Sequence, residues 1–305
     1  MNDTRLNKLY TSVNLVELQE FYKSFGSRNE LIAWMKRRPN EQMRLFEING
    51  KTDIVFVIPT ADVNGNYSKC CKLLYKNWYI IFVQSKGPNF NFGRSCNFGI
   101  KRALELNPKY VVISNDDIYK IDDINNFAKN LLKIKPIPNA VLIKPTDKKP
   151  VLNCKIIKVP SVTALIYYNI KAFITPFYKF YPALLKKYNL KYLVLVSDPN
   201  KNKEHELNRF IYKPKAEFRL QGNFFVLSRS FLEANGSKAF DETFINSFED
   251  VDLFYKIKLE NNYKFIKFKI GAYNSGTFRF DQLHAFRGLA NTIYFNYKLE
   301  KNYKF

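Results

Sequence analysis

The chain has 305 residues, of which 46% are hydrophobic and 16% aromatic, and this composition excludes a disordered chain. Its 49 lysines and arginines against 27 aspartates and glutamates give a formal net charge of +22 at pH 7. This charge suits an anionic partner, such as nucleic acid, an acidic membrane face or a phosphorylated substrate, or else reflects lysines spread over a solvated surface.

Cysteine usage and hydropathy indicate the compartment. The four cysteines show neither C-x-x-C spacing nor a disulfide framework, which favours a reducing compartment without structural zinc. The first residues lack the apolar core of a signal peptide, and no window reaches the ~18 uncharged apolar residues of a spanning helix. We therefore expect a cytoplasmic protein, soluble or peripheral at the inner membrane face.

The first 50 residues are expected to form a helical extension. "NLVELQEFYKSF" and "NELIAWMKRR" carry apolar residues at helical spacing, and Pro39 ends the second run. The pattern of apolar residues then changes, because "TDIVFVIPT", Thr52 to Thr60, is a continuous apolar run. Such a run is typical of a parallel strand that is covered on both faces.

The next segments alternate between helix and strand patterns. A helical pattern in "YSKCCKLLYKN" leads to a strand "WYIIFVQS", a Gly/Asn-rich turn "KGPNFNFGRSCNFG", a helix "IKRALELNP", and strands "KYVVIS" and "NAVLIKP". This order predicts a doubly wound, mostly parallel sheet. Because ligands collect at the carboxyl ends of such strands, three loops should converge: Pro59 to Asp62, Gln84 to Asn97, and Asn115 to Asp117.

The second half begins with a change of composition. Residues 151–216 are rich in Tyr, Phe and Lys and are expected to form an insertion of mixed structure. Its segment "AFITPFYKFYPALLKKYNLKYLVL" either packs around an enlarged core or forms the part of a site that binds an acceptor. In the second case its Tyr and Phe rings would stack on sugars or lie against lipid. From Phe218 onward we expect a strand "FRLQGNFFVLS", a helix "RSFLEANG" ending at Gly236, and a helix after "FED".

The first acidic cluster follows the strand "KYVVIS". Asn115, Asp116 and Asp117 offer oxygen ligands that suit a hard cation such as Mg²⁺ or Mn²⁺, which would bridge a diphosphate. Alternatively, the two aspartates cap the next helix, around Ile121 to Lys133.

The second acidic cluster is Glu249, Asp250 and Asp252, at the start of a predicted helix. Acids in a first turn complement the helix dipole. If the fold brings the two clusters together, one could hold a metal and the other could remove a proton. Other chemistries lack their motifs, since the chain has no P-loop, no G-x-G-x-x-G, no G-x-S-x-G and only two histidines.

The order of these segments resembles glycosyltransferase family 2, and in particular its rhamnosyltransferase-like branch of inverting nucleotide-sugar transferases with a GT-A fold. The matching segments are "VFVIPT", "NFGRSCNFGIKRAL", "YVVISNDD", "GNFFVLSRSFLEANG", "FDETF" followed by "FEDVDL", and "RGLANTIYFNYK". The resemblance implies a Rossmann-like, mostly parallel central sheet flanked by helices. Its domain would cover 51–298, with a nucleotide-sugar half (51–150), the insertion (151–216) and an acceptor and catalytic half (217–298). The helical extension (1–50) and a tail (299–305) would flank it.

The resemblance also implies roles on the donor side. Pro59, Thr60 and Ala61 would line the base and ribose pocket, and Asp116 would contact the ribose or phosphate. Asp117 would bind Mn²⁺ or Mg²⁺ with Asn115 in support.

On the acceptor side, the resemblance implies that Asp250 is the catalytic base and that Glu249 orients it or the acceptor. Gly222 would let donor and acceptor approach the backbone closely. The implied reaction is an inverting transfer from a UDP-, TDP- or GDP-sugar to a hydroxyl of a glycan, a protein or a lipid-linked acceptor.

The chain departs from the family pattern at three places. Gln84 stands where the family commonly has an aspartate that reads the nucleobase or ribose, and the shorter turn leaves Arg94 and Asn97 as donor contacts. The family's metal-binding histidine should lie near "GAYNSG", so Asn274 or His284 is the candidate to replace it.

Two other classes of function remain open at this stage. A nucleic-acid binder would explain the charge of +22 and the interleaved aromatic residues. We nevertheless expect no nucleic-acid partner, because acids stand at the edge where the sheet should bind its ligand and no nucleic-acid motif is present. A degenerate transferase fold with a binding role would bind neither metal nor donor.

Overall fold

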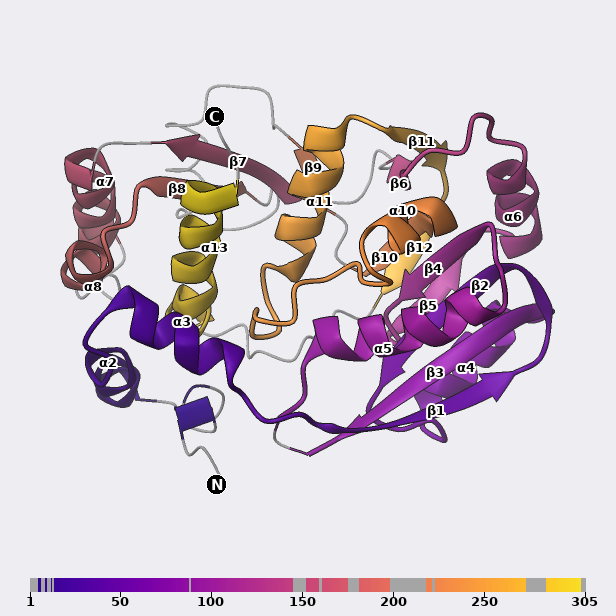
Figure 1. Cartoon of the computed structure of the whole chain (residues 1–305), viewed down its shortest axis with the longest axis horizontal. Coiled ribbons are helices and arrows are strands. Elements are labelled where there is room, and N and C mark those ends of the chain that lie inside the picture. Colours follow the sequence, from indigo (N-terminus) through magenta and orange to yellow (C-terminus); the bar gives the residue numbers. More distant parts are fainter. Residues whose placement is uncertain are drawn as a thin grey trace.

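The computed structural model describes residues 5–6, 9, 12, 14–87, 89–144, 152–158, 161–174, 181–197, 218–220, 223–272 and 284–302. Within them the fold centres on a seven-stranded sheet in the order β1-β3-β2-β4-β10-β6-β11 (Figure 1). The strands are β1 (Gln42–Ile48), β2 (Lys51–Thr60), β3 (Trp78–Lys86), β4 (Tyr110–Ser114), β6 (Ala140–Lys144), β10 (Phe224–Ser228) and β11 (Tyr263–Lys267).

Five of these seven strands run in one direction. β2 pairs in parallel with β3 and β4, β6 pairs in parallel with β11, and β10 is antiparallel to both β4 and β6. β1 is antiparallel to β3 at the edge of the sheet. The predicted mixed α/β architecture with a mostly parallel central sheet is therefore confirmed.

Helices cover both faces of the sheet. α5 (Phe92–Glu105) lies on one face, and α4 (Asn66–Leu74) and α6 (Ile124–Leu132) lie on the other (Figure 1). Side chains of β2 alternate accordingly, with Val55 and Val57 packed on the α5 face and Phe56 packed on the α4 face. This double burial explains why the strand reads as a continuous apolar run.

The N-terminal segment is helical only in part. α2 (Leu15–Lys23) and α3 (Arg28–Lys36) are helices as predicted, and the side chains of Asn14 and Ser27 cap them. The last part of the expected extension is strand β1. It was missed because it is a half-exposed edge strand of mixed polarity rather than a buried apolar run.

Two further predicted boundaries are wrong. The segment expected to be a Gly/Asn-rich turn is helical from Phe92, because the Asn91 side chain accepts a hydrogen bond from Arg94 N and caps α5. The single strand expected from Phe218 is two strands in different sheets, β9 (Phe218–Leu220) and β10.

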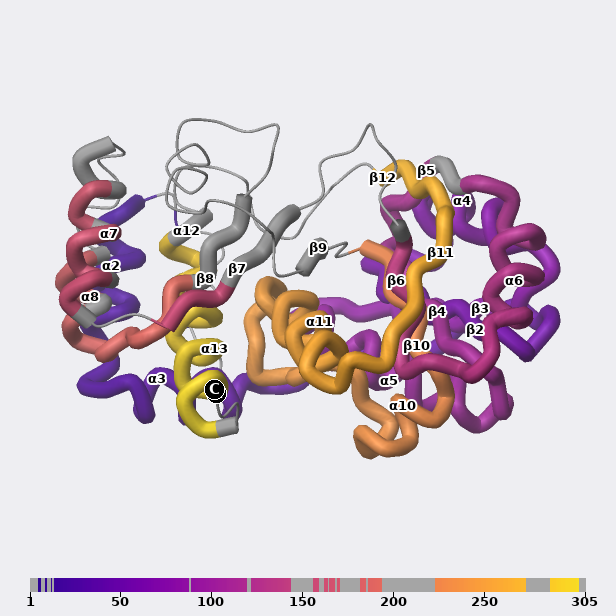
Figure 2. The backbone as a smooth tube through the Cα atoms, turned by 90° about the horizontal axis from the view of Figure 1, so that it is seen from above, coloured from indigo at the N-terminus to yellow at the C-terminus, as the bar shows by residue number. Residues whose placement is uncertain are grey.

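The remaining elements build a second, largely helical region. The three-stranded sheet β8-β7-β9 stands beside several helices, with α11 between this region and the main sheet (Figure 2). No helix in the described part of the chain is long and apolar enough to cross a membrane. The elements of this region are β7 (Leu152–Lys158), α7 (Ser161–Ile174), α8 (Tyr181–Tyr188), β8 (Tyr192–Ser197), α12 (His284–Arg287) and α13 (Leu289–Asn302), and α11 is Glu249–Glu260. On the side of the main sheet, α10 (Arg229–Ala234) packs on β10, and β5 (Ile118–Ile121) pairs with β12 (Ile270–Ala272) beside α4.

Candidate functional site

The carboxyl ends of β2 and β4 carry a hydrogen-bonded pair of polar side chains. Thr60 Oγ1 donates to Asp116 Oδ2 at 2.7 Å, and Ser68 Oγ in the first turns of α4 lies 3.0 Å from Thr60 Oγ1. The chain passes from β2 to β3 on one side and then crosses back over β2 to β4 on the other side, so the strand order reverses at the crevice between β2 and β4, which is the topological switch point. In open α/β sheets, ligands bind at this place.

Asp116 and Asp117 bring negative charge to the switch point. Burial raises the pKa of Asp116, the neighbouring Asp117 raises it further, and the hydrogen bond from Thr60 opposes both effects. Asp117 is itself only 4% exposed. Carboxylate oxygens gathered at one place are the ligands that a hard divalent cation prefers.

Amide oxygens stand beside these carboxyl groups. Asn115 N donates to Asn223 O at 3.0 Å, which places the start of β10 next to the end of β4. The buried side-chain oxygens of Asn115 and Asn223 accept no hydrogen bond from any residue that the structure describes. Buried oxygens with open lone pairs suit a hard cation.

The fit to a divalent ion therefore depends on amide as well as carboxylate oxygens. The described residues contain no cluster of three or more His, Cys, Asp or Glu side chains that could hold a metal. His284 begins α12, but its side chain lies outside what the structure describes, as do Tyr273, Asn274 and Gly222. The expected histidine ligand stays a prediction.

The capping alternative for the first cluster is wrong. α6 begins at Ile124, and its cap is Asp123, whose Oδ1 accepts hydrogen bonds from Asn125 N at 2.8 Å and Asn126 N at 3.4 Å. β5 separates Asp117 from this helix. The acids at the switch point therefore have no capping role in α6.

The other predicted donor residues near β2 lie as follows. Pro59 is buried near the end of β2, and Ala61 is exposed in the loop that follows. Gln84, at the end of β3, donates from Nε2 to Ala61 O at 3.3 Å. The ends of β2, β3 and β4 thus meet at one edge, as the alternation of helices and strands predicted.

The second acidic cluster occupies the first turn of α11. Phe248 precedes the helix with a left-handed φ of 74°, which is strained for an aromatic residue and gives no side-chain cap. Val251 N donates to Asp250 Oδ1 at 2.8 Å. Asp250 is half-buried and Glu249 is 6% exposed.

Burial raises the pKa of both carboxyl groups, Glu249 and Asp250. It is the main cause that raises the pKa of Glu249 to about 8, and the charge on Asp250 adds to it. Burial also raises the pKa of Asp250 above its ordinary value. At neutral pH Glu249 therefore carries its proton.

The elements that carry the two acidic clusters both contact β10. Asp250 and Phe254 are four residues apart and share one face of α11, and the Phe254 ring packs on the Phe225 ring of β10 with centroids 5.6 Å apart. Phe225 is two residues from Asn223, which contacts Asn115. Glu249 is also near α5, because its charge helps to raise the pKa of Cys96.

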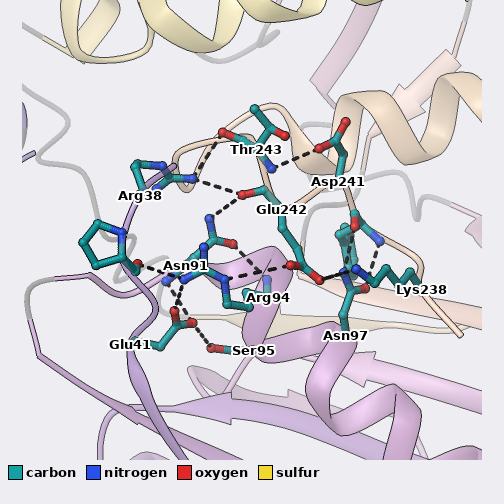
Figure 3. A network of polar contacts seen from close by, with 12 residues as sticks. Arg38, Glu41, Asn91, Arg94, Ser95, Asn97, Lys238, Asp241, Glu242 and Thr243 are labelled. Carbon is teal, nitrogen blue, oxygen red and sulfur yellow. Dashed lines mark hydrogen bonds and ion pairs between the residues drawn. The ribbon is translucent and has the colours of Figure 1, made fainter. Parts of the chain in front are cut away.

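Long-range polar contacts fix the segment 239–246, which leads into α11 (Figure 3). Arg38 Nη2 donates to the carbonyls of Glu242 (3.1 Å), Thr243 (3.2 Å) and Phe244 (2.8 Å). Asn291 of α13 donates to Ile245 O at 3.0 Å and accepts from Ile245 N at 2.8 Å. These contacts hold the backbone immediately before Glu249 and Asp250.

Two residues predicted as donor contacts belong to this network. Asn97 Nδ2 donates to Phe240 O at 2.8 Å, and its Oδ1 accepts from the backbone N–H groups of Ala239 and Phe240. Arg94 Nη1 lies 2.6 Å from Glu41 Oε2. Both side chains thus contact other parts of the protein.

A cavity of about 460 Å³ opens beside the network. It lies between the end of α3, the start of α5 and the segment 239–246. Its charged lining residues are Lys36, Arg38, Arg94, Lys238, Asp241 and Glu242. Both signs of charge are present, and two of the cations are paired, Arg94 with Glu41 and Lys238 with Glu242.

Sequence reasoning missed the residues that support the site, namely Arg38, Ser68, Asn223 and Asn291. Asn223 had a signal, because it follows Gly222 inside a predicted strand. The sequence matches no protein-family model and none of the curated proteins compared with it. The geometry of the site and the resemblance of its motifs are therefore the basis for assigning a function.

Proposed function

We propose that the protein is an inverting glycosyltransferase that moves a sugar from a nucleotide-diphosphate sugar to an acceptor hydroxyl. The observation that carries this proposal is the Thr60–Asp116 pair at the switch point, with Asn115 and Asp117 beside it. A neutral ligand would leave this acidic edge uncompensated, whereas a diphosphate bound through a cation would neutralise it.

In this proposal the donor binds along the ends of β2, β3 and β4. Pro59, Thr60 and Ala61 line the base and ribose pocket, with Gln84 at its side and Asp116 on the ribose. The N-terminus of α4 follows the same loop and has no side-chain cap at Gly65. Its N–H groups and the helix dipole favour a phosphate group there.

Asp117, Asn115 and, as the sequence predicts, His284 would hold the Mn²⁺ or Mg²⁺. The ion would supply charge neutralisation on the leaving diphosphate. The chain's own contribution is to fix these oxygens: Asn115 is held through its backbone by Asn223, and Asp116 by Thr60.

Asp250 is the proposed general base. It takes the proton of the acceptor hydroxyl while that oxygen attacks the anomeric carbon, and the bond from that carbon to the diphosphate oxygen breaks on the opposite face. General-base help of this kind is worth about 10²–10⁴-fold in rate. Glu249, protonated below a pKa of about 8, donates a hydrogen bond to the acceptor or to Asp250.

Two substitutions test the assignment. Asp250→Asn should lose sugar transfer and keep donor binding, whereas Asp117→Ala should lose metal-dependent donor binding. Donor affinity is measured by calorimetry with and without Mn²⁺ for UDP-, TDP- and GDP-sugars, and transfer by release of the nucleotide diphosphate. Asp53→Asn, which alters an exposed carboxylate paired with Lys109, is the matched control.

Three outcomes would contradict the proposal. Wild-type transfer in both variants would remove the site assignment. Binding of neither donor nor metal by the wild-type protein would favour the degenerate fold. Steeply salt-dependent binding to nucleic acid without donor binding would favour the nucleic-acid binder.

A further inference from the structure

α7 presents an apolar stripe to solvent. Val162, Ile166 and Ile170 follow each other at four-residue spacing and are 66%, 54% and 45% exposed. Residues at this spacing lie on one face of a helix. Thr163 and Asn169 are also exposed, and both are uncharged.

The helix that carries this stripe is packed on the body of the protein. Tyr167, on another side of α7, is 5% exposed, and α7 packs beside α8. α8 is fixed to α2 because Tyr188 OH donates to Tyr22 O at 2.7 Å. Figures 1 and 2 show α2, α7 and α8 together at one end of the molecule. The stripe is therefore left exposed by a helix that is buried along another side, at Tyr167.

The sequence from which α7 and α8 are built is basic and lacks acidic residues. Residues 148–197 contain no aspartate or glutamate. They contain nine lysines: Lys148, Lys149, Lys155, Lys158, Lys171, Lys179, Lys186, Lys187 and Lys191. Lys158, Lys186 and Lys191 are exposed next to or between the elements of the α7–α8 hairpin.

We propose that the α7–α8 hairpin docks the protein on an anionic lipid bilayer. The apolar stripe enters the boundary between headgroups and acyl chains, and the exposed Lys158 and Lys186 contact anionic headgroups. A second copy of the chain would bring the same basic surface and another charge of +22, so self-association on this face is opposed. Nucleic acid would match the lysines and leave the stripe exposed.

The test is co-sedimentation of the full chain with phosphatidylcholine vesicles, with and without phosphatidylserine. The wild type should bind the anionic vesicles, and Ile166→Ser/Ile170→Ser should bind at least tenfold more weakly. Lys186→Ala should weaken binding about fivefold. Leu73→Ser/Leu259→Ser is the matched control, because these residues are exposed apolar positions (78% and 55%) on α4 and α11.

The outcomes are distinct. Binding that is weakened by the α7 variant and not by the control, with unchanged circular dichroism and melting of both, supports docking through the stripe. No vesicle binding, or binding abolished by salt yet equal in the α7 variant and wild type, overturns the proposal. A concentration-dependent dimer lost in the α7 variant also overturns it. Since no step measures sugar transfer, failure here leaves the proposed function untouched.

Discussion

Glu249→Gln tests whether the acid at the start of α11 carries a proton at neutral pH. The folded pKa of this carboxyl group is about 8, against an ordinary value of 4.5, chiefly because the group is buried. Glutamine has the shape and neutral charge of the protonated acid. The substitution therefore replaces the titrating group and leaves the packing of α11 in place.

The direction of the pH effect follows from the raised pKa. Between about pH 4.5 and pH 8 the folded protein keeps this proton and the unfolded chain releases it, so stability falls as the pH rises through this window. A difference of 3.5 pKa units, 8 minus 4.5, corresponds to a loss on the order of 5 kcal/mol. We expect Glu249→Gln to match the wild type at the acidic end of the window and to be more stable by several kcal/mol above it.

The measurement is urea unfolding of both proteins across this pH range, compared as differences so that other titrating groups cancel. Glu260→Gln serves as the control, since it removes an exposed carboxylate from the same helix. Stability curves of Glu249→Gln and wild type that stay parallel over the whole range would refute the buried proton. A side chain that destabilises the fold at neutral pH is also what a functional site leads one to expect.

Two further predictions concern packing around the site. Lys298→Met removes the cation from the half-buried carboxylate of Asp241 and the buried carboxylate of Asp252, which lie 2.8 Å and 2.7 Å from Nζ. The substitution should cost about 3–5 kcal/mol in urea unfolding, and adding Asp241→Asn and Asp252→Asn should recover most of this loss. An unchanged midpoint in the single variant would disprove the role of Lys298. Gly99→Ala places a Cβ 2.4 Å from Val57 Cγ1 and should lower the free energy of unfolding by about 1–3 kcal/mol, and Val57→Ala should restore it. A gain in stability, as expected for alanine at an open helix position, would contradict the close approach of α5 to the sheet.

The strands of the sheet were predictable to the extent that they are buried on both faces. β2, β3, β4 and β6 are apolar runs and appear where the sequence placed them. β1 was missed because an edge strand alternates in exposure and needs no continuous run. The start of α5 was missed for a different reason: Gly93 and Gly99 look like turn residues, but a Cβ at Gly93 would lie 3.1 Å from Phe240 Cβ. Their smallness serves packing against segments far away in the chain.

The contacts of the candidate site were likewise predictable only in part. The convergence of Thr60, Gln84 and Asp116 follows from strand order, because parallel neighbours end at one edge. The partners of Asn97 do not, since they are backbone groups of Ala239 and Phe240, more than a hundred residues further on. Local patterns show that an asparagine can bind a peptide group, but only the packing of α5 against the segment 239–246 decides which one.

The antiparallel direction of β10 explains how the second half of the chain reaches the switch point. β10 lies beside β4 with Phe224 opposite Ser114, so its first residue is at the carboxyl edge of the parallel strands. Asn223 therefore contacts Asn115 directly. The chain then runs away from the site along β10 and returns through the segment 239–246 to α11. Were β10 parallel to β4, its start would lie at the opposite edge of the sheet and Asn223 could not contact Asn115. The one reversed strand in the middle of the sheet is thus what joins the acids after β4 to the element that carries Asp250.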